Sequence, residues 1–299
     1  MQVQDVDLKL LKVFDTIVQC GGFAAAQSAL NVSGSRISEY MSQLEARIGV
    51  RVCERGRSGF RLTEDGVQFH QAARRLLGAI DTFCLESAGL RKQLRGTLRF
   101  GVIEATLIDE QSPLLPAIRS FVRVAPKVDL QIVMDTPAGM EQRVLDGSLH
   151  LAVGPFQKKV SGLVYRRLYQ EEQLLYCASP HPLYSCPAGA KQSEEIRRSR
   201  LAARSYLGGN ELSLLQIGEA AASVDNVEGR AMLILSGIYV GFLPPHYAKT
   251  WEQSGLLRRI NPERLRTQLE FKIIWRRGQQ PARTVQCLLD HLASAGQQR

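Results

Sequence analysis

Hydrophobic side chains recur at helical spacing in segment 33–48, where Ile37, Met41, Leu44 and Ile48 follow at steps of four, three and four residues. This is the period of a single buried stripe on an α-helix. The other faces of the segment carry hydroxyl groups, a guanidinium group and a carboxylate. The pattern therefore predicts a helix that packs on one side and leaves its polar side free.

A shorter, alanine-rich helix is predicted over residues 23–30, and only Asn31 and Val32 separate it from the longer one. Two short helices joined by so tight a turn, with the second polar at its N-terminal end, have the organisation of a helix-turn-helix. A hairpin is predicted after Gly49, since the chain there is rich in arginine and punctuated by glycine. The arginines of this hairpin, which outnumber its single acid Glu54, are Arg51, Arg55, Arg57 and Arg61. We interpret the hairpin as a wing that binds DNA phosphates.

A longer apolar seam follows residue 65 and recurs at steps of four, three, four, three and seven residues. Its members are Phe69, Ala73, Leu76, Ile80, Phe83 and Leu90. The spacing is close to a heptad pattern over about three repeats. A long helix with such a seam, between two domains, is expected to pair with a copy of itself. Packing against the first domain of its own chain is the alternative, and each interpretation can hold at a different end of the helix.

The chain changes character at residues 91–96, a polar, basic and glycine-terminated stretch that suits a hinge. Short β-rich runs then alternate with helical segments. This alternation predicts a parallel α/β sheet, with enough units for two small lobes and ligand space between them. Ligands of such sheets bind among the loops at the carboxyl ends of the strands. The residues that this rule selects are Glu104, Thr106, Thr136, Ser205, Tyr206, Asn226 and Glu228.

The composition, with 44% hydrophobic and 22% charged residues, is that of a globular protein, and 299 residues are enough for two or three domains. The net charge of +9 favours a polyanionic partner, and its placement beside the helix-turn-helix pattern favours nucleic acid. The sequence shows no signal peptide, no apolar run of membrane-spanning length and no zinc-binding cysteine pattern. We therefore expect a cytoplasmic protein with no membrane contact, no metal and no cofactor.

Segment 23–56 reads FAAAQSALNVSGSRISEYMSQLEARIGVRVCERG, and it is the most specific motif of the chain. The shorter motifs that follow are, in order, LTEDG, GTLRFGV, VLDGSLHLAVG, ASPHPL and GIYVGFLP. In this order and over this total length, the motifs resemble the LysR-type transcriptional regulators. The resemblance covers essentially the entire chain.

The resemblance implies an α/β multidomain protein that binds promoter DNA as a dimer or tetramer, acts on RNA polymerase and responds to a small-molecule effector. The implied parts are a winged helix-turn-helix domain at 1–64, a long linker helix for dimerisation at 65–90, a hinge at 91–96, and a two-lobed α/β effector domain like the periplasmic binding proteins at 97–299. Within the effector domain, lobe I is expected at about 97–164 and 267–299, and lobe II at about 165–266.

Carried over by position, the DNA contacts of the family correspond to Gly34, Ser35, Ser38 and Glu39 of the second helix and to Arg55 and Arg57 of the wing. Many relatives have Gln-Pro where this chain has Gly34-Ser35, and arginine where it has Glu39. Glycine cannot read a base edge, and a carboxylate accepts hydrogen bonds only from the amino groups of cytosine or adenine. We therefore expect a different operator, with Arg36 taking over one contact. Ser33 either caps the helix or contacts DNA.

Members of the family commonly hold an acidic effector with hydroxyl and backbone amide groups, at positions that correspond to Thr106 and Thr136. Glu104 and Glu228 belong to the same predicted crevice and would repel a carboxylate. Two interpretations remain open. Either these glutamates point away from the crevice, or the effector is neutral or carries an amine.

An enzyme is not expected, since the sequence contains no phosphate-binding glycine loop, no zinc-protease motif and no serine-hydrolase elbow. A redox-sensing regulator is the alternative function, because Cys177 and Cys186 are nine residues apart and could approach if the chain turns back between them. Cys177 lies in an apolar strand, however, where cysteine commonly acts as a small buried hydrophobe. A ligand-binding module without a regulatory task would have no use for the N-terminal domain.

Overall fold

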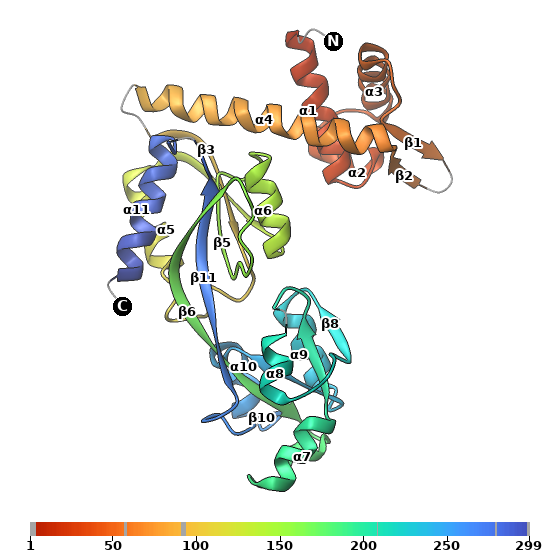
Figure 1. Ribbon diagram of the computed structural model, residues 1–299. Coiled ribbons are helices and arrows are strands. Elements are labelled where there is room, and N and C mark those ends of the chain that lie inside the picture. The colour runs from red at the N-terminus through yellow and green to blue at the C-terminus, as the bar shows by residue number, and fades with distance from the viewer. Residues whose placement is uncertain (1–3, 57–58, 91–93, 208, 279, 298–299) are drawn as a thin grey trace.

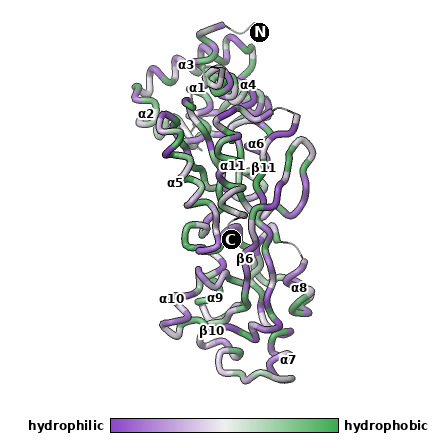
Figure 2. Tube along the Cα trace, turned by 90° about the vertical axis from the view of Figure 1, so that its left-hand side faces the viewer, coloured by the Kyte–Doolittle hydropathy of each residue, from purple (hydrophilic) through white to green (hydrophobic). Residues whose placement is uncertain are grey.

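The computed structural model describes residues 4–56, 59–90, 94–207, 209–278 and 280–297. Figure 1 shows a small helical domain, a long helix that lies along one α/β lobe, and a second α/β lobe at the far end of the molecule. The view in Figure 2 shows the same elongated arrangement, with the N-terminal helices at one end and α7 at the other. The predicted architecture, a small helical N-terminal part followed by a long helix and a two-lobed α/β part, is confirmed.

The N-terminal domain consists of α1 (Asp5–Gln19), α2 (Phe23–Leu30), α3 (Gly34–Ile48), β1 (Cys53–Gly56) and β2 (Gly59–Leu62). The predicted apolar stripe of α3 is buried, because Ile37, Met41 and Leu44 are all inaccessible to solvent. They share a hydrophobic core with Phe14 of α1. The tight turn between α2 and α3 passes through Asn31, whose φ of 52° is left-handed. The predicted helix-turn-helix and hairpin are confirmed.

A buried ion pair fixes α3 against α1. The Asp7 carboxylate accepts hydrogen bonds from the backbone N–H of Gln4 (2.8 Å) and from Nη2 of Arg47 in the last turn of α3 (2.7 Å). The Arg47 guanidinium lowers the pKa of Asp7, so this carboxylate stays charged inside the domain. Asp7 therefore both caps α1 and ties it to the last turn of α3.

The apolar seam of α4 (Glu64–Leu90) divides between two environments. Phe69 and Ala73 pack on the core of the N-terminal domain. Phe83, two seven-residue repeats after Phe69, is 67% exposed. Packing against the first domain of the same chain is thus observed for the first half of the helix. Pairing with a second copy stays a prediction for the exposed part.

Lobe I contains β3 (Arg95–Val102), α5 (Leu114–Val124), β4 (Lys127–Met134), α6 (Pro137–Leu145), β5 (Leu151–Gly154) and α11 (Arg283–Gln297). Lobe II contains the 3₁₀ helix η1 (Pro182–Tyr184), α7 (Ala190–Arg198), β7 (Arg200–Arg204), α8 (Asn210–Leu215), β8 (Ala222–Val224), α9 (Val227–Leu235), β9 (Tyr239–Leu243), α10 (Pro245–Gln253) and β10 (Leu257–Arg259). Two long strands, β6 (Leu163–Ala178) and β11 (Arg266–Arg276), run side by side from one lobe to the other.

The expectation of a parallel sheet is wrong for the strands that join the lobes. Parallel pairing occurs within each lobe, between β3 and both β4 and β5, and between β7 and both β8 and β9. The strands β6 and β11 pair antiparallel with each other, and β6 also pairs antiparallel with β9 and β10. The physical reason is the path of the chain. It enters lobe II along β6 and returns to lobe I along β11, so these neighbours must run in opposite directions.

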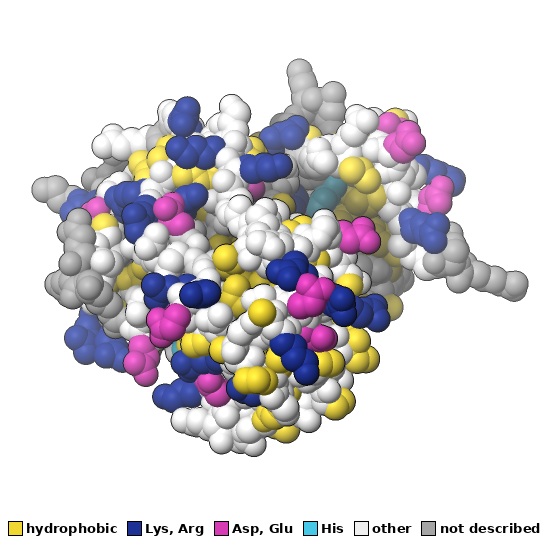
Figure 3. Space-filling view, turned by 60° about the horizontal axis from the view of Figure 1, so that its bottom comes forward, with side chains coloured by type: hydrophobic (Ala, Val, Ile, Leu, Met, Phe, Trp, Pro, Cys, Tyr) yellow, Lys and Arg dark blue, Asp and Glu magenta, His cyan; other side chains and the backbone are white. Residues whose placement is uncertain are grey.

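Each lobe has a hydrophobic core of its own, and β6 passes from one core into the other. Leu163 belongs to the core of lobe I, whereas Leu174 and Tyr176 are buried in lobe II. Among the described residues, none of the helices combines the length and the apolar character that a membrane span requires. Figure 3 shows the lobe II end of the molecule, where basic, acidic and hydrophobic side chains are intermixed. The net positive charge is therefore not gathered on that face.

Candidate nucleic-acid interface and effector site

The polar face of α3 is accessible to solvent and carries the residues that were predicted to contact DNA. Ser33 stands just before the helix, and its Oγ accepts a hydrogen bond from the backbone N–H of Arg36 (3.4 Å). Ser33 thus caps α3, and it also lies 3.0 Å from the hydroxyl of Ser35. Along the same face, Ser35 and Glu39 are exposed, and Gly34 and Ser38 are half-buried.

Arg36 and Glu39 form an ion pair on this face, with Nη1 2.8 Å from Oε2. The guanidinium of Arg36 lies 5.0 Å from the centroid of the Tyr40 ring, and Nζ of Lys9 lies 4.8 Å from the same ring. Lys9 and then Arg36 lower the pKa of Tyr40. Two basic side chains, one from α1 and one from α3, therefore lie near one aromatic ring of α3. Periodicity did not indicate Lys9 or Tyr40, because Lys9 belongs to another helix and Tyr40 lies beside the apolar stripe.

The wing is present as the antiparallel pair β1–β2, in which Glu54 is opposite Arg61. Arg61 is exposed on β2. Arg57 and the side chain of Arg55, the two predicted wing contacts, lie outside the described residues.

The predicted effector residues lie where the two lobes face each other. A cavity of about 350 Å³ is lined there by Glu104, Met134, Asp135, Thr136, Asp225, Asn226 and Glu228. Of the predicted residues, Glu104, Thr136, Asn226 and Glu228 thus come together. The other three, Thr106, Ser205 and Tyr206, lie outside the lining of this cavity.

Glu104 links the lobes directly. Its Oε1 accepts a hydrogen bond from the backbone N–H of Val227, the first residue of α9, at 2.9 Å. Nη2 of the buried Arg204 lies 3.6 Å from the same oxygen. The positive end of the α9 dipole and its free N–H groups make a natural anion site, and here a carboxylate of the protein itself occupies it. Of the two open interpretations, the one in which Glu104 points away from the crevice is wrong.

The hydroxyl and amide groups of the site are used in helix caps. Thr136 Oγ1 accepts from the N–H of Gly139 (3.2 Å) at the start of α6, and Asn226 Oδ1 accepts from the N–H of Gly229 (2.7 Å) at the start of α9. Ser205 donates its hydroxyl to Asp225 (2.6 Å). The cavity wall is therefore dominated by carboxylate groups, from Glu104, Asp135, Asp225 and Glu228.

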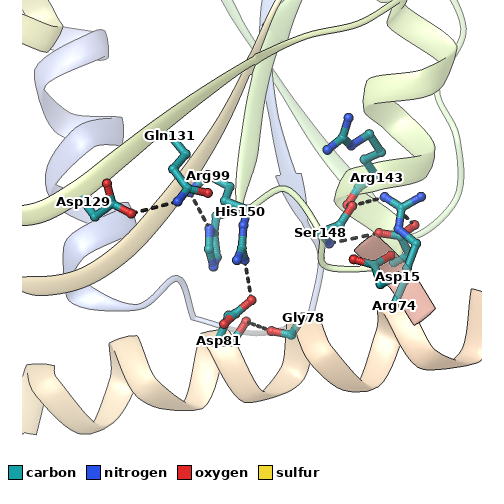
Figure 4. Close-up of polar contacts among 12 residues, drawn as sticks. Asp15, Arg74, Gly78, Asp81, Arg99, Asp129, Gln131, Arg143, Ser148 and His150 are labelled. Atoms are coloured by element: carbon teal, nitrogen blue, oxygen red, sulfur yellow. Dashed lines mark hydrogen bonds and ion pairs between the residues drawn. The ribbon is translucent and has the colours of Figure 1, made fainter. Parts of the chain in front are cut away.

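The linker helix α4 lies directly on lobe I, and Figure 4 shows the polar contacts between them. Nη2 of Arg74 lies 3.3 Å from Oδ2 of Asp146, and Asp81 pairs with Arg99 of β3. Between these two pairs Gly78 packs against the backbone of Gly147, whose φ of 81° is left-handed. A Cβ at position 78 would lie only 2.6 Å from the carbonyl carbon and oxygen of Gly147. We call this contact the linker dock.

His150 lies beside the linker dock and stays uncharged. Its Nδ1 accepts a hydrogen bond from the backbone N–H of Arg99 at 2.9 Å. Burial, aided by the nearby Arg99 charge, lowers the pKa of His150 to about 4. Near neutral pH the ring is therefore neutral, and the Asp81 carboxylate is left to pair with Arg99 alone.

The two cysteines of the redox alternative are buried in the core of lobe II. Burial raises the pKa of the Cys177 thiol to about 12, so very little reactive thiolate is present near neutral pH. Both thiols are free. This environment gives no support to a thiol switch.

The arrangement described above agrees with comparisons to known proteins. Residues 8–67 match the family described as bacterial regulatory helix-turn-helix protein, lysR family, and residues 91–297 match the LysR substrate binding domain. The chain therefore belongs to the LysR family of transcriptional regulators. It is a DNA-binding transcriptional regulator whose C-terminal part is an effector-binding domain.

Individual relatives support the same assignment. The HTH-type transcriptional activator BauR of Pseudomonas aeruginosa is 39% identical over 293 residues, which cover 98% of this chain and 96% of BauR. The probable HTH-type transcriptional regulator YhaJ of Escherichia coli is 23% identical and covers 90% of each chain. Among solved structures, the LysR family regulator CbnR aligns with a TM-score of 0.65 at 21% identity, over 97% of this chain and 99% of CbnR. Full-length CbnR in complex with its target DNA aligns equally well.

Proposed function

We propose that this LysR-family regulator binds promoter DNA through the polar face of α3 and the β1–β2 wing, and that an amine-bearing effector in the interlobe cavity controls it. The observation that carries the proposal is the cavity wall with its four carboxylates. An acidic effector would meet like charge there, and the anion site at the start of α9 already holds Glu104. A cationic group would find opposite charge on both lobes.

The DNA contacts assigned to α3 are Ser35, Arg36, Ser38 and Glu39, next to Gly34 and to Ser33 at the cap. The side chains of Arg36 and Glu39 are both about half exposed. A DNA base can therefore replace Glu39 as the partner of Arg36, or Arg36 as the partner of Glu39. Glu39 then accepts from cytosine or adenine, and Arg36 donates to guanine. Arg55, Arg57 and Arg61 of the wing supply contacts to phosphate.

Replacing Arg36 by alanine is expected to weaken binding to the selected operator by about 1–3 kcal/mol while leaving non-specific DNA nearly unaffected. Replacing Arg61 by alanine is expected to weaken binding to all sequences and to lower the salt slope by about one. Fluorescence anisotropy over a salt series, with an operator selected from random DNA by the full-length protein, measures both effects. Arg264→Ala, which removes an exposed arginine of lobe II, is the matched control. Equal losses for the two test variants on both DNAs would contradict the assigned roles.

A panel of small primary amines and carboxylates of matched size tests whether the effector is a cation or an anion. We expect stabilisation by an amine, about 2.7 kcal/mol at one hundred times its Kd, and none by the carboxylates. Glu228→Gln is expected to weaken amine binding about tenfold, since it removes one carboxylate from the wall. Thermal shift and calorimetry with the full chain measure this.

Glu219→Gln is the control for the effector test, because Glu219 is exposed on lobe II and lies outside the cavity lining. Binding of the carboxylates instead of the amines would refute the amine effector. If Glu228→Gln left the amine affinity unchanged, the amine would have to bind at a site other than this cavity.

We further propose that the chain associates as a dimer or tetramer, with the exposed part of the α4 seam around Phe83 as one contact. An exposed aromatic side chain on a long helix between two domains is suited to this task. In the cytoplasm such an assembly places two recognition helices on one promoter and acts on RNA polymerase without catalysing a reaction itself.

A further inference from the structure

Three side chains of metal-ligand type meet where the two lobes and the crossing strands converge. Asp109 follows β3 of lobe I, Glu171 lies on β6, and His246 lies in the first turn of α10 of lobe II. One ligand atom from each of them lies within 4.8 Å of the other two. Nε2 of His246 is 3.6 Å from Oε1 of Glu171, and its Nδ1 is 3.9 Å from Oδ1 of Asp109. Donor atoms around a tetrahedral ion with bonds of about 2.1 Å are roughly 3.4 Å apart, so three ligand atoms within 4.8 Å of one another must move closer by up to about 1.4 Å to bind one ion.

Each acid has one oxygen held by a neighbour. Asp109 Oδ1 accepts from the N–H of Gln111 at 2.9 Å, and Glu171 Oε2 accepts from Nε2 of Gln173 at 2.5 Å. Hydrogen bonds of this kind orient the ligands of a metal site. The hydrogen bonds from Gln111 and Gln173 therefore hold the Asp109 and Glu171 carboxylates in defined orientations.

Several buried polar atoms of the cluster have no hydrogen-bond partner among the described residues. They are Asp109 Oδ2 and His246 Nε2, and Oε1 of Gln173, the residue that donates to Glu171, is likewise without a partner. Asp109 is 8% exposed and Gln173 is 1% exposed. Leaving such groups unpaired costs free energy, so their presence points to a bound species that accepts their lone pairs.

The surroundings favour positive charge. The adjoining cavity of about 690 Å³ is lined by the acids Asp109, Glu110, Glu171, Glu172 and Glu252 and by the bases Lys249 and Arg259, in addition to His246. A cation at this position would relieve the repulsion between the carboxylates of Asp109 and Glu171.

We propose that Asp109, Glu171 and His246 bind one divalent transition-metal ion, of the zinc or cobalt type, at the base of the interlobe region. Two carboxylates and one imidazole suit such an ion and leave a coordination position for water. The ligands come from lobe I, from β6 and from lobe II, so the ion stabilises one relative position of the lobes. None of the three lines the cavity proposed for the effector. The metal site thus stands independently of the amine effector.

The test uses the full-length protein after treatment with a chelator. Calorimetry with ZnCl₂ is expected to show one ion bound per chain, and CoCl₂ is expected to give the visible absorption of a low-symmetry cobalt site. His246→Ala and Asp109→Asn are each expected to weaken Zn²⁺ binding by more than about tenfold, since even outer neighbours of a metal ligand change affinity by about 10–100-fold. His291→Ala removes a histidine from α11 and is expected to leave the affinity unchanged.

Glu171→Gln, which preserves the shape of the side chain, is the further variant, and circular dichroism with operator binding checks that every variant folds. Absence of stoichiometric Zn²⁺ and Co²⁺ binding by the folded wild-type protein overturns the proposal. Equal Zn²⁺ affinity in the wild type and in all three ligand variants overturns it too, because the ion is then bound elsewhere. Stoichiometric binding that is lost in the folded ligand variants and kept in His291→Ala supports it.

Discussion

Replacing Glu211 by glutamine is expected to lower the free energy of unfolding of the effector domain by about 3–5 kcal/mol, because it leaves a buried guanidinium without its counter-charge. Arg230 is completely buried, and its Nη1 and Nη2 lie 3.0 and 2.8 Å from the two carboxylate oxygens of Glu211. Nη1 also donates to the carbonyl of Phe242 at 2.7 Å. Burial lowers the pKa of Arg230 and the Glu211 carboxylate opposes this. The ion pair joins α8 to α9 and β9 at the centre of lobe II.

Urea unfolding followed by circular dichroism measures the effect of this substitution. Glu194→Gln is the matched control, since Glu194 pairs with Arg197 and Arg198 at the surface, where water screens the pair and its loss is expected to leave the free energy of unfolding nearly unchanged. The double variant Glu211→Leu with Arg230→Met is expected to recover more than half of the loss, because an apolar pair of similar volume needs no counter-charge. A cost below about 1 kcal/mol for Glu211→Gln would show that the charge of Arg230 is compensated by other groups.

Replacing Gly78 by leucine is expected to displace α4 from lobe I. Even the first side-chain atom would lie 2.6 Å from the backbone of Gly147, and backbone cannot move aside as a side chain can. The resulting strain is expected to cost about 1–3 kcal/mol at the linker dock. The N-terminal domain should remain folded, because Gly78 takes no part in its core. Hydrogen exchange is then expected to rise in β3 and the second half of α4 but not in α1 or α3.

The effect of Gly78→Leu on regulation is tested by measuring operator affinity with and without saturating effector. We expect this change to be largely lost in Gly78→Leu, since a linker helix that no longer touches lobe I cannot follow its movement. Gly89→Ala is the control within the same helix, because a Cβ there would meet Arg283 at an ordinary 3.5 Å. Unaltered exchange and unaltered effector response in Gly78→Leu would mean that the linker dock does not transmit the signal.

The local features of the fold could be predicted from the sequence because they depend on neighbours along the chain. A stripe at helical spacing is buried in any compact structure, and Ile37 and Met41 are buried for that reason. Ser33 caps α3, and Asn226 starts α9, since a short polar side chain can satisfy the first free N–H groups of a helix. The loops after the strands also indicated Glu104, Thr136 and Glu228 as neighbours in one cavity.

Other features could not be predicted, because they depend on contacts between elements that are distant along the chain. The strands β6 and β11 have the composition of any buried strand, and only their passage between the lobes makes them antiparallel neighbours. Gly78 had no pattern that set it apart, and its role appears only where it meets Gly147. The direction of the Glu104 side chain depends on the position of α9 in the other lobe.

The sequence by itself thus determined the class of protein, the order of its parts and the helix-turn-helix, since periodicity, caps and motifs are properties of short segments. Only the tertiary structure decided which charges meet. It brought four carboxylates to one cavity, closed the anion site of α9 with Glu104, and assembled Asp109, Glu171 and His246 from three separate elements. The physical reason is that electrostatic and coordination energies depend on distances of a few ångströms in space, which separation along the chain does not reveal.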